Sequence, residues 1–226
     1  MRLALVVVFF GLVAGFALPS HPADRPQDPF GGATVETAEL KAGPLAKSWK
    51  DLRHRLYRDD LRIAACVEFS KAACPPVAKL FDVVEEARHQ VGKALLAHLN
   101  RTINLMIRPV LPQDWTSALD VFQRGMGDCK AYSIAKYVAL LWAGIPIEHL
   151  RLVIVYNPNR GEQHMIVTVF QDREWLILDN LTMTLVKDSE QKNYEPMFVL
   201  DDIGVRSYTP QIALGDHGSD WPGCPA

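Results

Sequence analysis

Cys129 stands where a protein can activate a thiol for nucleophilic attack. It directly follows Asp128, a good N-cap residue, and no helix breaker occurs from Cys129 until Gly144 and Pro146. The N-terminus of a helix carries partial positive charge and N–H groups without intrahelical partners. Both features stabilise a thiolate and can stabilise a developing oxyanion. We therefore predict a helix over residues 129–143 whose first residue is a candidate nucleophile.

A histidine and an aspartate are predicted to meet on the strands that follow. An even-length turn centred on Asp172 and Arg173 places Asp179 opposite Ile166, on the same sheet face as His164. Diagonal neighbours of this kind lie roughly 7–8 Å apart at Cβ. An aspartate at that distance can orient a histidine ring, as in a catalytic triad. The alternative is an ordinary core histidine and a small buried cysteine without a catalytic role.

Helical patterns come first in the chain and strand patterns second, which predicts an α+β domain. The nearly all-apolar helix over 129–143 is expected to lie in the middle of that domain. The predicted helices cover 49–60, 77–100, 101–107, 118–124 and 129–143, and the predicted strands cover 150–156, 164–171, 174–180 and 197–200.

The N-terminus has the anatomy of a secretory signal peptide. Arg2 is followed by an apolar run and by small residues at Gly15 and Ala17, which predicts cleavage after residue 17. A membrane anchor is the alternative, but about 15 apolar residues fall short of the roughly 20 that span a bilayer. After this segment (1–17) we predict a proline-rich leader over 18–45, the domain over 46–208 and a loose tail over 209–226.

Export permits disulfide bonds. Cys66 and Cys74 are separated by eight positions, ahead of Pro75, and are predicted to form a local disulfide; two buried thiols are the alternative. Cys129 and Cys224 remain of the four cysteines, and we assign no role to Cys224. Four cysteines are too few for a disulfide scaffold, and their spacing is not that of a zinc site.

Composition removes several functional classes. A net charge of −2, with 49% hydrophobic and 22% charged residues, is typical of a globular protein and gives no basic field for nucleic acid. The sequence contains no P-loop, no GxGxxG and no HExxH motif. We therefore expect no resident cofactor, no nucleic-acid partner and no membrane span after signal cleavage.

Around these residues the sequence resembles the bacterial transglutaminase-like cysteine proteinases. The resemblance covers about residues 45–208. It is carried by Gly127-Asp128-Cys129-Lys130, Ile134-Ala135-Lys136-Tyr137, Gly144-Ile145-Pro146, Leu150-Arg151-Leu152-Val153, Gln163-His164-Met165 and Leu178-Asp179-Asn180.

The resemblance implies a papain-like, transglutaminase-type core, in which N-terminal helices and the nucleophile-bearing helix pack on an antiparallel sheet. It implies a thiol protease, with Cys129 as nucleophile, His164 as general base and acid, and Asp179 as the residue that orients the histidine. Relatives of this kind are periplasmic proteases that clip surface adhesins. A periplasmic or secreted hydrolase with a protein substrate, a surface adhesin, is therefore expected; no oligomeric state is predicted.

Two residues near Cys129 raise further questions. Some relatives depend on calcium held by acids around the cysteine, which makes Asp128 a candidate calcium ligand. Lys130 and Ala131 stand where many relatives carry acids, and this argues against calcium, because calcium needs several oxygen ligands. Trp115, in the loop before the nucleophile, is a candidate substrate-binding residue, with core packing as the alternative.

Three functions fit these residues. The first is a cysteine endopeptidase that forms a thioester and hydrolyses it with water. The second is an acyltransferase that uses the same triad with an amine acceptor. The third is a non-catalytic binding domain that retains the fold.

Overall fold

The structure, a computed structural model, describes residues 25–69 and 73–209. The predicted signal peptide over 1–17, the residues 210–226 of the predicted tail and Cys224 lie outside the described residues. The helices are α1 (Ala38–Ala42), α2 (Pro44–Phe69), α3 (Pro75–Arg88), α4 (Lys93–Met106), α5 (Ala118–Arg124) and α6 (Cys129–Trp142), with short 3₁₀ turns at Pro29–Gly31, Ile147–His149 and Asp188–Glu190.

The main sheet has seven antiparallel strands in the order β1-β9-β8-β4-β5-β6-β7, and β2 and β3 form a separate parallel pair. The strands are β1 (Ala33–Val35), β2 (Arg108–Pro109), β3 (Met126–Gly127), β4 (Leu150–Asn157), β5 (Glu162–Gln171), β6 (Glu174–Leu178), β7 (Val186–Lys187), β8 (Glu195–Leu200) and β9 (Val205–Thr209).

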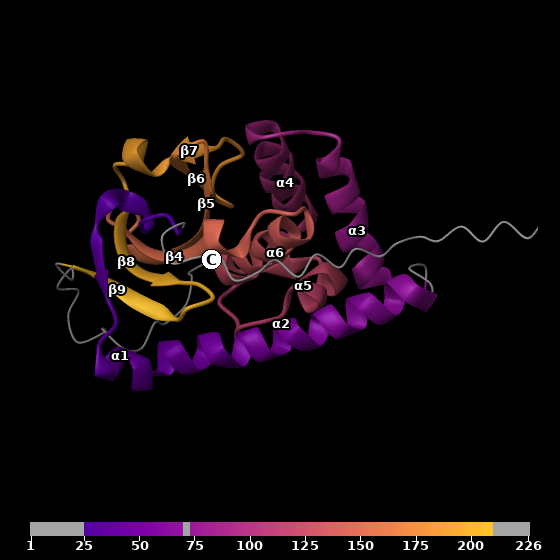
Figure 1. The fold of residues 1–226 in the computed structure, drawn as a ribbon, viewed down its shortest axis with the longest axis horizontal. Helices are drawn as coiled ribbons and strands as arrows, with labels where there is room; N and C mark the ends of the chain where they lie inside the picture. Colours follow the sequence, from indigo (N-terminus) through magenta and orange to yellow (C-terminus); the bar gives the residue numbers. More distant parts are fainter. Residues whose placement is uncertain (1–24, 70–72, 210–226) are drawn as a thin grey trace, which may run out of the picture.

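Helix α6 lies at the centre, between the sheet and the other helices (Figure 1). It packs on β5 on one side and contacts α3, α4 and α5 on the other, while the long helix α2 runs along one edge of the molecule. Its residues from Cys129 to Leu140 are all buried. The predicted α+β class and the predicted central helix are both confirmed.

The cap of α6 is the one its sequence predicts. The carboxylate of Asp128 accepts a hydrogen bond from the backbone N–H of Ala131 at 3.2 Å, which satisfies an N–H that the helix itself leaves without a partner. The cap fixes where the helix begins. Cys129 is therefore its first residue.

The β5–β6 hairpin has the predicted register. Val167 pairs with Leu178, and Asp172 and Arg173 form the turn with φ of 53° and 65°. Positive φ at both central residues is the geometry of a type I′ turn, whose twist matches that of the flanking strands. Asp179 follows directly after the last paired residue of β6, at one end of the sheet.

The single helix predicted over 77–100 is wrong. Helix α3 ends at Arg88, and α4 begins at Lys93 after Gly92, whose φ is +58°. Glycine adopts that conformation without steric penalty, so the chain turns there. Val91 continues the apolar spacing but is 83% exposed, which made the two helices look like one. The stretch predicted over 101–107 forms the second half of α4.

The expected leader over 18–45 also differs from the structure from residue 25 onward. Strand β1 pairs with β9 at the edge of the main sheet, and α2 begins at Pro44, well before the predicted start at residue 49. Asp28 forms ion pairs with the fully buried Arg151 and with Arg206. Proline content suggested a linker, but the charged partners of Asp28 lie far along the chain and left no local signal.

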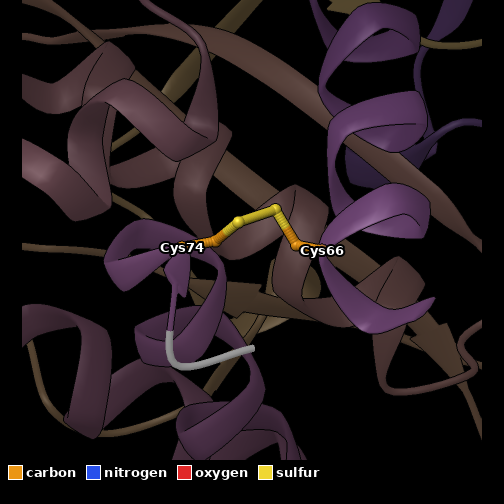
Figure 2. The surroundings of a disulfide bond; sticks show 2 residues. All are labelled: Cys66 and Cys74. Atoms are coloured by element: carbon orange, nitrogen blue, oxygen red, sulfur yellow. A yellow bond between two sulfur atoms is a disulfide. The ribbon is translucent and has the colours of Figure 1, made fainter. Parts of the chain in front are cut away.

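The predicted disulfide is present. Cys66, near the end of α2, is bonded to Cys74, which precedes α3, with their Cα atoms 6.1 Å apart (Figure 2). The bond ties the long edge helix to the helical layer. Within the described ranges, no helix combines the length and the apolar character needed to cross a bilayer.

Candidate active site

His164 and Asp179 form a buried pair at the end of the β5–β6 hairpin. Nε2 of His164 lies 2.7 Å from Oδ1 of Asp179, and their side chains are 4% and 2% exposed. The same Oδ1 atom accepts a hydrogen bond from the backbone N–H of Leu181 at 2.9 Å. The register predicted that these two residues would be diagonal neighbours, several ångströms apart at Cβ. Their side chains extend toward each other and bring Nε2 and Oδ1 into hydrogen-bonding distance.

The carboxyl group of Asp179 is held ionised. Burial by itself would raise its pKa, but the hydrogen bond and charge of His164 lower it, as do the N–H of Leu181 and the O–H of Tyr194; together they bring it to about 2. Asp179 therefore carries a negative charge throughout the physiological range. It can stabilise an imidazolium on His164 and fix the orientation of the ring.

The sulfur of Cys129 contacts the backbone of β5 next to His164. The backbone N–H of Met165, the residue after His164, donates a hydrogen bond to Cys129 Sγ at 3.2 Å. Ser133, one turn further along α6, donates from Oγ to the carbonyl of Met165 at 2.8 Å. These two contacts fasten the start of α6 to β5, so the cysteine and the histidine are positioned by one helix–strand contact.

Cys129 is oxidised in the structure, where its sulfur belongs to a disulfide. Since the thiolate is the nucleophilic form of cysteine, reduction must precede any attack by this sulfur.

Tyr194 and Asn104 complete the surroundings of Asp179, and our sequence analysis missed both. The hydroxyl of Tyr194 donates to Asp179 Oδ2 at 2.5 Å, and the amide of Asn104 donates to the Asp179 carbonyl at 2.8 Å. Burial and the neighbouring Asp179 raise the pKa of Tyr194, which keeps its hydroxyl a donor. Asn104 gave a signal that could have been used, namely a polar residue on the apolar face of a helix. Tyr194 gave none, because it lies in a loop.

Lys136, two turns along α6 from the cysteine, is another buried ionisable group near the pair. It is 1% exposed, and burial lowers its pKa to about 7, although the Asp179 carboxylate partly opposes this shift. An ammonium in such surroundings is poorly solvated and gives up its proton readily.

Trp115 lies in the loop that leads to α5. It is partly buried against the main core, and its carbonyl accepts a hydrogen bond from Arg55 at 3.0 Å. It also lines an open pocket of about 390 Å³ with Arg55, Gln113 and Arg124. Trp115 thus packs on the core and borders a pocket, and its role as a substrate-binding residue stays a prediction.

No group of three or more His, Cys, Asp or Glu residues in the described part of the chain is arranged to hold a metal ion. Asp128, the candidate calcium ligand, is buried, and its carboxylate is in contact with Lys130.

A cysteine that begins a central helix, packed against an antiparallel sheet that carries a buried His–Asp pair, defines the papain-like, transglutaminase-type class of fold. The sequence matches the family described as bacterial transglutaminase-like cysteine proteinase BTLCP over residues 65–199. The chain belongs to this family of cysteine peptidases, as its resemblance predicted.

Solved structures of LapG from Legionella pneumophila are similar to this chain. One has a TM-score of 0.54 at 21% sequence identity, covering 61% of this chain and 80% of LapG. The calcium-bound form gives 0.54 at 21%, covering 64% and 86%, and the EGTA-treated form gives 0.53 at 22%, covering 60% and 76%. At this identity the likeness establishes the fold. No curated protein sequence matches the chain.

Proposed function

We propose that this chain is an exported cysteine peptidase that hydrolyses peptide bonds of a cell-surface or periplasmic protein. Cys129 is the nucleophile, His164 the general base and acid, and Asp179 the residue that orients the imidazole. One observation carries the proposal. The buried His164–Asp179 contact of 2.7 Å lies one residue from the Met165 amide that meets the Cys129 sulfur at 3.2 Å. A nucleophile, a base and an orienting group are the parts that covalent acyl chemistry needs.

The reaction follows from these positions. Once reduced, Cys129 transfers its proton to His164, and the N-terminus of α6 favours the resulting thiolate. The thiolate attacks the peptide carbonyl, and the imidazolium protonates the leaving amine, which leaves a thioester on Cys129. His164 then takes a proton from water, which attacks the thioester and releases the new carboxylic acid. Since Nε2 of His164 faces Asp179, Nδ1 is the nitrogen that exchanges these protons.

Two features support export. Residues 1–17 have the anatomy of a signal peptide, and the Cys66–Cys74 disulfide is of the kind that persists in oxidising compartments. For the substrate, the adhesin-clipping relatives that the sequence resembles suggest a surface adhesin. Trp115 is the proposed substrate-binding residue, because it borders a pocket in the loop that precedes the cysteine.

The first test measures the reactivity of Cys129. The protein without residues 1–17 is reduced, and the rate of its labelling by iodoacetamide is followed against pH with peptide mapping. Rapid labelling of Cys129 well below the ordinary thiol pKa of about 8.5 is expected, and His164→Ala should abolish it. His149→Ala removes a histidine whose ring makes an edge-on contact with Phe170 in another part of the fold, and it should leave the profile unchanged. An ordinary thiol profile in the unaltered protein contradicts the proposal.

The second test identifies the reaction from product masses, using a synthetic peptide library and the reduced protein. Hydrolysis gives fragments that together contain one added water, whereas acyl transfer gives joined peptides. Cys129→Ala should abolish turnover, and Asp179→Asn should lower kcat/KM by on the order of 10²–10⁴-fold. Asp172→Asn, in the exposed hairpin turn, is the matched control. Joined peptides would identify an acyltransferase, and a folded, reduced protein without products would favour a binding domain.

A further inference from the structure

The carboxylate of Asp128 joins three parts of the chain around the start of α6. Its Oδ1 accepts the N–H of Ala131 at 3.2 Å, and its Oδ2 accepts the N–H of Gln113 at 3.0 Å. Its Oδ2 also forms an ion pair with the ammonium of Lys130. One carboxylate therefore caps the helix that bears Cys129 and docks the preceding loop onto it.

The ion pair is almost completely excluded from water, with the Lys130 side chain 3% exposed and that of Asp128 2% exposed. A buried charge is costly unless an opposite charge and hydrogen bonds compensate for it. The two N–H groups on Asp128 supply hydrogen bonds but no full positive charge. Lys130 supplies that charge, so the buried carboxylate has an oppositely charged partner.

This arrangement does not fit a calcium ion. Calcium takes six to eight oxygen ligands, mostly carboxylates and carbonyls. Next to Asp128, this chain has the ammonium of Lys130 and the methyl group of Ala131, neither of which offers an oxygen. The cation that touches Asp128 is the lysine itself. The structurally similar LapG, by contrast, has been solved in a calcium-bound form.

We propose that the Lys130 ammonium is the built-in cation of this site, and that the loop before α6 stays docked without a metal. Lys130 is thus a positioning residue: it holds Asp128, which in turn holds the helix start and the loop at Gln113. The proposal rests on the proposed function only in treating Cys129 as the nucleophile.

The loop has a second attachment to the same region, which makes its docking consequential. Strand β2 pairs with β3, and the N–H of Val110 donates to the carbonyl of Gly127 at 3.2 Å. The residues directly before Cys129 therefore pair with the loop on one side and lead into α6 on the other. Removing the charge of Lys130 should loosen both the start of α6 and the docked loop. A change at Lys136, on the same helix but remote from the Asp128 carboxylate, should loosen neither.

The test combines calcium titration by calorimetry with melting temperatures in CaCl2 and in EGTA. The unaltered protein should give no binding heat and the same melting temperature in both solutions. Lys130→Met should melt at a lower temperature without responding to calcium. Lys130→Glu should melt lower in EGTA and recover partly in CaCl2, because it restores an acid beside Asp128. Lys136→Met, which removes the other buried lysine of α6, should acquire no calcium response.

Three outcomes would overturn the proposal. They are calcium binding by the unaltered protein, an unchanged melting temperature in Lys130→Met, and a Lys130→Glu protein that folds but ignores calcium. None of these readouts depends on peptidase activity. A failure of Cys129 to act as nucleophile would therefore appear separately, in the labelling and turnover assays.

Discussion

Replacing Lys136 with methionine should make the protein more stable at neutral pH. The lysine is 1% exposed, and burial lowers its pKa from 10.5 to about 7. Methionine keeps an unbranched chain of similar length and removes the charge, so the buried helix face can remain packed. The Asp179 carboxylate gives Lys136 a favourable charge interaction, but burial is the larger effect.

The magnitude follows from the two pKa values. A fall from 10.5 to about 7 corresponds to roughly 5 kcal/mol of unfavourable free energy in the folded state, as an upper limit. Below pH 7 both states bind the proton, and the whole cost is present. Between pH 7 and 10.5 the unfolded chain keeps a proton that the folded chain has released, so the unfolding free energy rises with pH.

The pKa of about 7 already includes the attraction of Asp179, and the full cost is an upper limit, so we expect a gain of about 1–4 kcal/mol at pH 7. Urea unfolding at several pH values between 6 and 10 measures this difference. The gain should shrink as pH rises, since deprotonation of Lys136 relieves the same cost in the unaltered protein. Lys50→Met, at an exposed position of α2, is the control and should show no such trend. Equal stability at pH 7, or a gain independent of pH, would refute the reasoning.

Three other predictions concern the frame of the site. Replacing Cys66 and Cys74 together with serine should lower the unfolding free energy by about 2–3 kcal/mol, because the bond closes a short loop; unfolding of the oxidised proteins measures it. Gly127→Ala should cost about 1–3 kcal/mol, because its Cβ would lie 2.2 Å from that of Ala131; an unchanged urea midpoint would contradict this. Tyr194→Phe should lower stability by about 1 kcal/mol and reduce kcat more than KM, because it removes a hydrogen bond from the buried carboxylate; equal kinetics would exclude a positioning role.

The elements that carry the proposed site were predictable from local rules. Asp128 marks the start of α6, and the two-residue turn at Asp172 and Arg173 sets which residues of β5 and β6 face each other. These rules act over a few residues, so they can be applied to a sequence alone. They place His164 and Asp179 on one sheet face from the sequence alone.

The features that sequence analysis missed depend on contacts between distant segments. Tyr194 reaches Asp179 from a loop, and Asp28 pairs with Arg151 across most of the chain. Val91 caused a different error: its apolar side chain at helical spacing predicted one continuous helix, but the residue is exposed between α3 and α4.

The pairing of β1 with β9 has a consequence for the order of folding. Ala33 lies opposite Thr209, so the first and last strands of the described chain are neighbours in the sheet. Contacts between such distant residues form late, because a long loop must close before they can be made. For the exported chain proposed here, which would leave the cytoplasm N-terminus first, the sheet cannot be completed until the region around Thr209 has followed. Until then β1 has no partner strand and β8 is an open edge of the sheet, and that open edge is a point at which chains can associate wrongly.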